Sequence, residues 1–488
     1  MAVSHGGGHP RCHSAVGRIS DVTKIFCTRH RHDRDKRMRV QRRKERAYAE
    51  KGGDKMNSFL RLVLKTPGRI TLLLLGMILL QFSLQPPAYG QVTIDFWHAM
   101  EGPKGHVLTE MAKDFMKEYP NIKVNVSLQG GYTDIVRKVQ AGIAADALPD
   151  LVMLGQRHGI PQISESGRLL VLDEYVTAED RKDISPGLFG RYTYKGKVMA
   201  IPFAVSTPIF HINANRFKEV GLNPDKPPTT WDDLVAYAKK LTRDLDGDGR
   251  IDQWGFNIHS DIPWHVYGFI YQNGGTIYGS DGQAKLDSPE AIQAFQFWSD
   301  LVHKHKVMPP LAHEGGSKLF TAGNLGIFQR SSAFIEGAAK AIGKRFDYRV
   351  AYLPKSKIYA VPDGGGGLGV FKSAPEKERA AITLMKWFTS TKGIARFSKD
   401  TGYITFRKSS IALPEMKVFF AESTRDHVAA LQMEYVRSNP VNHADGVVWD
   451  ELGNLIEKIE SNPKADIPTL LKELNAKVNK EIAEYRGK

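Results

Sequence analysis

The most regular arrangement of potential metal ligands in the sequence is an acidic segment, DLDGDGRID. Its carboxylates alternate along the chain and belong to Asp244, Asp246, Asp248 and Asp252. Such spacing surrounds Ca²⁺ in calcium-binding loops, but the twelfth position, which normally supplies a bidentate Glu, is Gly255 here. Two interpretations stay open: a structural Ca²⁺ site, and an acidic turn stabilised by hydrogen bonds to its own backbone. In either case we expect the segment to stabilise the fold rather than to carry out a reaction.

Sequence signatures of common catalytic centres are largely absent. No G-x-S-x-G motif and no H-E-x-x-H motif occurs, and the nearest phosphate-loop string, Gly337 to Lys344, has one residue too many between its glycines. We therefore expect neither an enzyme nor a cofactor. The alternative is a secreted enzyme that cleaves carbohydrate or phosphodiester bonds, because the spacing of two catalytic carboxylates exists only in the fold.

Aromatic and small polar residues gather at expected strand ends and turns. They are Trp97, His98, Tyr132, Ser206, Trp264, Ser331, Ser332, Tyr403 and the glycine run that contains Gly365. Turns at the ends of strands are where open α/β folds bind ligands. Polyols suit this mixture, because their C–H faces stack on aromatic rings while their hydroxyls pair with serine and backbone groups. The pattern predicts a site for a small polyhydroxylated solute, although any one aromatic taken alone is more often a core residue.

Strand and helix patterns alternate in the part of the chain that carries these residues. The first predicted elements are a strand over 92–97, a helix over 105–119, a strand over 121–128, a helix around Ile135 to Ile143 and a strand over 151–154. Farther on, helices are predicted over 231–241, from Ser288 onward, and over 375–390, 447–460 and 466–485. Thr230 and Asp233 form a capping box for the helix at 231. This order indicates mainly parallel sheets flanked by helices.

The positive charge of the chain is concentrated in its first part. The net charge is +15, but residues 1–55 hold 15 Lys and Arg against 6 Asp and Glu, and residues 56–90 add three cations, which leaves about +3 for the rest. We therefore expect no nucleic-acid partner. Residues 1–55 are interpreted as a basic extension that is disordered or results from a misassigned start.

Residues 56–90 have the organisation of a secretory signal peptide. A short basic region precedes the apolar run ITLLLLGMILL, and the small residues Ala88 and Gly90 mark a cleavage site. This run is shorter than the roughly 20 residues that a membrane-spanning helix needs. Both cysteines, Cys12 and Cys27, precede it, so the mature chain has no cysteine for a disulfide or a lipid anchor. We expect a monomer that is free in the periplasm.

Several motifs follow one another in an order that resembles a known family. They are FWHAMEG (96–102), GGY (130–132), PFAVSTP (202–208), GGGGLGVF (364–371) and TGY (401–403). Over about residues 92–485 the chain resembles the extracellular solute-binding proteins of carbohydrate ABC importers (family 1), and most closely the members that bind sn-glycerol 3-phosphate. The resemblance implies a protein that captures a sugar, glycerol 3-phosphate or a glycerophosphodiester by hinge closure. It also implies delivery of this solute to the membrane permease.

The same resemblance implies a two-lobed periplasmic-binding-protein fold of the class II type. Each lobe is expected to be a mainly parallel sheet flanked by helices, with the ligand in a cleft between the lobes. The expected lobes are residues 91–205 with about 350–400, and about 206–349 with 401–488.

Matching positions imply which residues contact the ligand. They are Tyr132, Gln156, Ser206, Trp264, Ser331 or Ser332, the backbone of Gly365, and Tyr403. The glycerophosphate binders use an Arg late in the chain, where this sequence has Asp445 or Gly446. Loss of a charge-assisted partner weakens phosphate recognition, although Arg330, Arg437 and His443 could supply other contacts. A neutral sugar and a glycerophosphate therefore both remain open as ligands.

Overall fold

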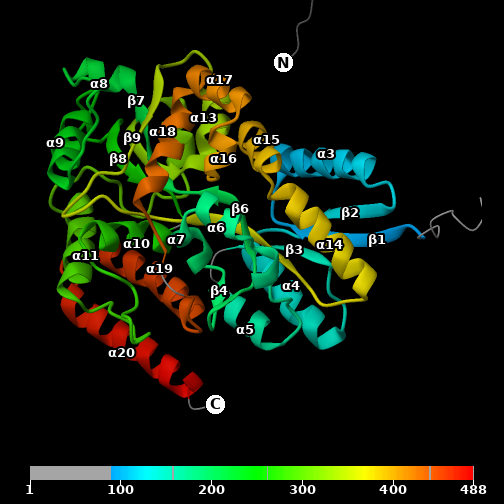
Figure 1. Cartoon of the computed structure of the whole chain (residues 1–488). Helices are drawn as coiled ribbons and strands as arrows, with labels where there is room; N and C mark the ends of the chain where they lie inside the picture. The colour runs from blue at the N-terminus through cyan, green and yellow to red at the C-terminus, as the bar shows by residue number, and fades with distance from the viewer. Residues whose placement is uncertain (1–89, 156–158, 261, 439–440, 487–488) are drawn as a thin grey trace, which may run out of the picture. The chain divides into compact units, whose positions relative to one another are not determined.

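The computed structural model describes residues 90–155, 159–260, 262–438 and 441–486 (Figure 1). The expected basic extension 1–55, the expected signal peptide up to residue 89, and Gln156 lie outside these described residues. The described residues belong to one compact unit. Among them, no helix combines the length and apolar character needed to span a bilayer.

The first sheet has five strands in the order β2-β1-β3-β12-β6. Their bounds are Val92–His98 for β1, Ile122–Leu128 for β2, Leu151–Leu154 for β3, Ile201–Ser206 for β6 and Gly364–Val370 for β12. Strand β1 runs parallel to β2 and β3, whereas β12 runs antiparallel to both β3 and β6. One strand is therefore reversed in a sheet whose other strands share a direction.

Helices cover both faces of the first sheet, as the buried strand β3 requires. They are α3 (Gly102–Glu118), α14 (Pro375–Phe388) and α15 (Thr391–Thr401) on one face, and α4 (Tyr132–Ala145) and α5 (Ile160–Glu165) on the other. Along β3, Leu151 and Met153 join the core under α3 and α14, while Val152 and Leu154 join the core under α4. This alternation follows the two-residue period of a strand. Figure 1 shows α3 above and α4 below the strands.

The second sheet has four strands in the order β10-β7-β9-β8. Their bounds are Pro208–Asn213 for β7, Trp254–Ile258 for β8, Leu325–Ser331 for β9 and Tyr348–Ala351 for β10. Strand β7 runs antiparallel to β10 and β9, and β8 runs parallel to β9. Again one strand, here β7, opposes the rest. It is separated from β6 of the first sheet by Thr207 alone, so its direction is set by the crossing between the sheets.

The second sheet is also enclosed by helices. One core contains α9 (Trp231–Leu241), α10 (Ile262–Gln272), α11 (Pro289–Val302), α19 (Asp445–Ser461) and α20 (Ile467–Arg486). Two smaller cores contain α12 (Gly316–Ala322), α13 (Ile335–Ile342), α17 (Pro414–Glu422) and α18 (Thr424–Leu431). Each sheet thus has its own hydrophobic core, which confirms the predicted two-lobed α/β fold.

The remaining described elements are short and lie in the connections. They are η1 (Asp173–Tyr175), α6 (Ala178–Asp183), α7 (Pro186–Gly190), β4 (Thr193–Tyr194), β5 (Lys197–Val198), α8 (Ala214–Glu219), η2 (Ser332–Phe334), β11 (Val361–Pro362), α16 (Lys408–Ile411), η3 (Gln432–Tyr435) and β13 (Val436–Arg437). Strands β11 and β13 pair in parallel, which ties two chain segments together beside β12.

Helix α9 shows how local sequence sets an element. The Thr230 side chain accepts a hydrogen bond from the Asp233 backbone N–H at 3.1 Å, and the Asp233 carboxylate accepts one from the Thr230 backbone at 3.0 Å. This is the predicted capping box, which satisfies two backbone donors at the start of the helix. The helix buries one apolar face, which consists of Trp231, Leu234, Ala238 and Leu241.

Candidate functional site

The glycine run at the start of β12 lets three predicted site residues approach its backbone. A Cβ built on Gly366 would lie 2.9 Å from the Tyr132 ring, and one built on Gly364 would lie 2.5 Å from the Trp264 ring and 2.9 Å from Ser206 Oγ. At Gly365 the backbone has φ +96°, and a Cβ would lie 1.6 Å from the carbonyl oxygen of Ala204. Only glycine fits these positions. We call Tyr132, Ser206, Trp264, Tyr403 and Gly364 to Gly366 the β12 cluster.

Tyr132 and Tyr403 meet at the first-lobe side of the β12 cluster. Tyr132 opens helix α4, and its hydroxyl lies 3.9 Å from the sulfur of Met153. Burial, followed by the neighbouring Tyr403 hydroxyl, raises the pKa of Tyr132 well above its ordinary value. The Tyr403 ring stacks on Phe397 with ring centroids 5.4 Å apart. Two tyrosines that are far apart in sequence therefore present neighbouring hydroxyls.

Trp264 comes from the second lobe and is held by the chain that enters β12. It lies on α10, is 3% exposed, and its indole N–H donates to the carbonyl oxygen of Asp363 at 2.8 Å. The Asp363 carboxylate in turn pairs with Arg191, with Nε and Oδ2 3.0 Å apart. Buried charges need such partners. The ion pair thus fixes the segment against which Trp264 packs.

Ser331 and Ser332 make structural contacts near the crossing between the sheets. Ser331 Oγ accepts a hydrogen bond from the Ala333 backbone at 3.2 Å, which caps η2. Ser332 donates its backbone N–H to the carbonyl of Thr207 at 2.8 Å, and its Oγ accepts from the Thr207 N–H at 3.3 Å. Gln432 donates to both Thr207 Oγ1 and the Pro208 carbonyl at 2.8 Å. These side chains therefore position the crossing.

The structure places the two residues at the end of β1 in the first lobe. His98 is buried, its Nδ1 accepts the Met100 N–H at 3.1 Å, and its ring lies 5.8 Å from that of Phe96. Burial lowers the pKa of His98, so the neutral ring is favoured. Trp97 packs against the core under α4. Strand alternation accounts for this, because both faces of the sheet are covered.

The three candidates for phosphate contact have separate surroundings. Arg437 is exposed on β13, opposite Pro362. His443 Nε2 lies 2.6 Å from the Tyr194 hydroxyl and 3.4 Å from the Glu165 carboxylate, an anion that disfavours a phosphate ligand. Arg330 hydrogen-bonds Ser317 Oγ, and its guanidinium lies 4.0 Å from the centroid of the Phe334 ring.

The acidic segment forms a tight turn whose carboxylates accept backbone hydrogen bonds. Oxygens of Asp244, Asp246 and Asp252 lie within 4.8 Å of one another, and all three side chains are exposed. Asp244 accepts N–H groups of Gly247 and Gly249 at 2.7 and 2.8 Å. These hydrogen bonds lower the pKa of Asp244. The contacts match the acidic-turn interpretation, and the Ca²⁺ site stays a prediction.

Sequence reasoning missed Lys104, which links the two lobes. It lies in the first turn of α3, and its ammonium donates to the carbonyl of Ala333 in η2 at 2.8 Å. The ammonium also lies 4.9 Å from the centroid of the Tyr403 ring. A cation is disfavoured in the first turn of a helix by the helix dipole. A Lys in the first turn of this helix therefore indicates, from the sequence alone, a role other than stabilising the helix.

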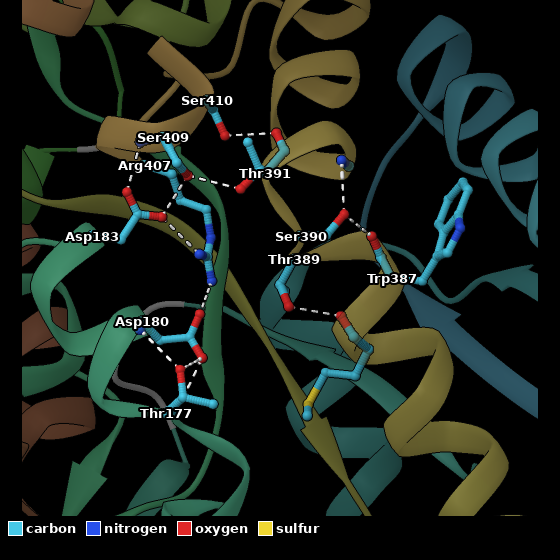
Figure 2. A network of polar contacts seen from close by, with 12 residues as sticks. Thr177, Asp180, Asp183, Trp387, Thr389, Ser390, Thr391, Arg407, Ser409 and Ser410 are labelled. Atoms are coloured by element: carbon cyan, nitrogen blue, oxygen red, sulfur yellow. Dashed lines mark hydrogen bonds and ion pairs between the residues drawn. The ribbon is translucent and has the colours of Figure 1, made fainter. Parts of the chain in front are cut away.

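A polar network anchors the segment that carries Tyr403 (Figure 2). Arg407 is largely buried and forms ion pairs with Asp180 and with Asp183, the latter at 2.8 Å. Ser409 donates its backbone N–H and its hydroxyl to Asp183 at 2.6 Å each. The network thereby attaches residues just after Tyr403 to α6 of the first lobe.

We expect the Arg407→Met variant to lose about 3 kcal/mol of unfolding free energy at pH 7, because two carboxylates lose a buried cation. Burial tends to raise the pKa of Asp180 and of Asp183, but hydrogen bonds from Arg407, Thr177 and Ser409 outweigh it and hold both below the ordinary 3.8. Since the folded pKa is depressed, this stabilisation is complete above the unfolded value and disappears as pH falls through the folded one. Urea titrations from pH 7 to pH 2.5 should therefore show the gap to wild type closing in acid.

The matched control for this variant is Arg396→Met, which removes a partly exposed ion pair with Asp114. It should change stability by less than about 1 kcal/mol. A gap for Arg407→Met that stays constant down to pH 2.5 would contradict the assigned role of the two carboxylates.

Comparison with known proteins identifies the family of the chain. Residues 110–422 match the family model described as bacterial extracellular solute-binding protein. The chain belongs to this family. The solute-binding protein is similar to the sn-glycerol-3-phosphate-binding periplasmic protein UgpB of Escherichia coli (strain K12), with 24% identity over 398 residues, covering 77% of this chain and 87% of the relative.

Solved structures show the same two-lobed fold. UgpB from Mycobacterium tuberculosis in complex with glycerophosphocholine superposes with a TM-score of 0.71 at 24% identity, covering 82% of this chain and all of that one. The cyclic alpha-maltosyl-1,6-maltose binding protein from Arthrobacter globiformis gives 0.70 at 24% identity, covering 80% and 98%. The chain is thus a bacterial extracellular solute-binding protein, and the comparisons do not support the enzyme alternative.

Proposed function

We propose that the protein binds a sugar, glycerol 3-phosphate or a glycerophosphodiester at the β12 cluster, closes around it, and delivers it to the permease. The observation that carries this proposal is the meeting of Tyr132 of the first lobe and Ser206, the last residue of β6, with Trp264 of the second lobe at one glycine-rich strand. Aromatic faces and hydroxyl groups together suit a polyol. The relatives bind glycerol 3-phosphate, glycerophosphocholine or an oligosaccharide, as their names state.

The proposed lobes follow the two sheets. The first consists of residues 91–205 with about 350–400, and the second of about 206–349 with 401–488. We move the boundary near 350 to the end of β10, because that strand pairs with β7 of the second sheet. Contacts made by Lys104 and Trp264 from one lobe to the other support closure as the mode of capture.

The proposal also covers the oligomeric state, the location, and the partners and cofactors of the protein. We infer a monomer that is exported by the segment 56–90 and is free in the periplasm, without a lipid anchor. The nearly neutral charge after residue 90 supports the absence of a nucleic-acid partner. No cofactor is needed to bind a solute in this way, and a structural Ca²⁺ in the acidic turn remains a hypothesis.

A ligand screen tests the proposed function. Purified protein is heated with sn-glycerol 3-phosphate, glycerophosphocholine, maltose, maltotriose and the cyclic tetrasaccharide, each at 1 mM as about 100 times a micromolar-range dissociation constant. A compound that binds only the folded state should raise the melting temperature by several degrees. The control is the Trp264→Ala variant, which should lose the shift. No shift with any compound, or conversion of a compound to a product, would contradict the proposal.

A further inference from the structure

Two cations from different lobes converge on one short turn, η2. Lys104 of α3 hydrogen-bonds the carbonyl of Ala333 at 2.8 Å. Arg330, at the end of β9, places its guanidinium 4.0 Å from the ring centroid of Phe334, the last residue of the same turn. Burial, and after it repulsion from Arg330, lowers the pKa of Lys104.

Lys104 differs from the other lysines of its helix in its hydrogen-bond partner. Lys113 and Lys117 are exposed and donate to Glu110 and Asp114 at 2.7 and 2.6 Å. Lys104 is partly buried, and the hydrogen bond that places it goes to an uncharged carbonyl. An ammonium has three donor hydrogens, so two are left for a further acceptor.

The same ammonium borders the β12 cluster. It lies 4.9 Å from the centroid of the Tyr403 ring, and the Tyr403 hydroxyl neighbours that of Tyr132. The carboxylate that faces Lys104 belongs to Glu336 of α13, whose own pKa is raised by burial and by Asp426 and Asp400. Lys104 therefore faces a carboxylate that binds protons more readily than usual, and it places a cation beside the Tyr403 ring.

The start of α19 offers no cation from Asp445. Asp445 is 2% exposed, and its carboxylate accepts the Tyr278 hydroxyl at 2.8 Å and the Asn442 N–H at 2.9 Å. It is thus part of the packing of α19. Its carboxylate is therefore occupied by contacts within the fold.

We propose that Lys104, with Arg330 beside it, recognises a phosphate group, so that the solute is a polyol phosphate monoester or diester and not a neutral sugar. This inference rests on the proposed function, which it narrows to one ligand class. When the lobes close, Lys104 donates its two remaining N–H groups to the phosphate. Arg330 attracts the phosphate by its charge, without a direct hydrogen bond to it.

The test is calorimetric titration of wild type and variants with sn-glycerol 3-phosphate, glycerophosphocholine, glycerol and maltotriose. Wild type should bind one or both phosphate compounds and neither neutral one. Lys104→Gln should weaken phosphate binding roughly tenfold to a hundredfold, since a hydrogen bond to a charged group is lost. Lys104→Arg should retain most of the affinity, and Lys113→Gln, the control on the exposed face of α3, should leave it unchanged. The melting temperature of each variant verifies folding.

The outcomes separate the two levels of the proposal. Binding of maltotriose without binding of either phosphate compound would overturn the inference and leave the function intact. Unchanged phosphate affinity in folded Lys104→Gln would also overturn it. Binding of none of the compounds would overturn both.

The pH dependence supplies a second readout. Burial, followed by repulsion from Arg330, lowers the pKa of Lys104 to about 8, against the opposing effect of Glu336. A phosphate favours the protonated form, so the wild-type affinity should fall roughly tenfold between pH 7 and pH 9, by linkage. Groups that face Lys104 are Arg330 on β9, Glu336 on α13 and the Tyr403 ring. In Lys104→Gln the decrease should be absent, and a flat wild-type profile would contradict the inference.

Discussion

Replacing Asp363 with Ala is expected to lower the free energy of unfolding by about 3 to 5 kcal/mol. The side chains of Arg191 and Asp363 are 2% and 0% exposed, and their charged atoms lie 3.0 Å apart. Removal of the carboxylate leaves the guanidinium buried without its counter-charge, which is among the most destabilising changes a core can undergo. Urea denaturation followed by circular dichroism measures the loss.

A control and a compensating variant sharpen this prediction. Asp225, which pairs with Arg349 on the surface, is 74% exposed, and Asp225→Ala should cost less than about 1 kcal/mol. The double variant Arg191→Met with Asp363→Leu should recover much of the lost stability, because no unpaired charge remains. A single-variant loss below about 1 kcal/mol would show that water or a rearranged partner satisfies Arg191.

The Asp363→Ala substitution also tests how the ion pair affects the β12 cluster. Trp264 donates to the backbone carbonyl of Asp363, which the variant retains, so a folded Asp363→Ala protein keeps this hydrogen bond. We therefore expect its affinity for ligand to fall less than its stability. The ion pair acts through the rigidity of the segment that enters β12.

Replacing Tyr403 with Ala is expected to reduce ligand affinity by about tenfold to a hundredfold, which corresponds to about 1.4 to 2.8 kcal/mol. The ring is contacted by Lys104 and by Phe397, and its hydroxyl neighbours Tyr132. Removal of the ring deletes an aromatic face and a hydroxyl at the point where the lobes meet. Calorimetric titration with the best compound from the ligand screen measures the change.

Two further variants distinguish the parts of this effect. Tyr403→Phe keeps the ring and loses only the hydroxyl, so it should bind ligand more weakly than wild type by about 1 kcal/mol, the worth of one hydrogen bond, and more tightly than Tyr403→Ala. Tyr237→Ala removes a partly buried tyrosine of α9, whose hydroxyl donates to the Lys226 carbonyl, and should leave affinity unchanged. Equal affinity of wild type and folded Tyr403→Ala would remove this residue from the site.

Local patterns predicted the elements of the fold well. The apolar stripe and capping box placed α9 at its observed bounds, and the predicted helices at 375–390 and 466–485 correspond to α14 and α20. Such patterns depend on residues within one or two turns of each other, which is why they can be recognised in the sequence. The order of the motifs indicated the family, and the family model matches residues 110–422.

The structure brings together some of the residues predicted for the site, and their contact with a ligand stays a prediction. Tyr132, Ser206, Trp264 and the glycine run meet, as expected from turns at strand ends. His98, however, is buried in the core of the first sheet, and Ser332 hydrogen-bonds Thr207 between the two sheets. Side chains at a buried strand end can contact neighbouring elements of the fold as well as a ligand. The function of a polar residue at such a turn depends on which element packs against it.

By itself the sequence determined the alternation of strands and helices, their caps, and the glycine run that permits close approach of side chains to β12, because these properties depend on neighbouring residues. Only the tertiary structure decided that β12 inserts between β3 and β6, that Asp363 meets Arg191, and that Lys104 reaches Ala333 across 229 positions of sequence. Charge pairing and burial depend on distance in space, which local sequence does not encode.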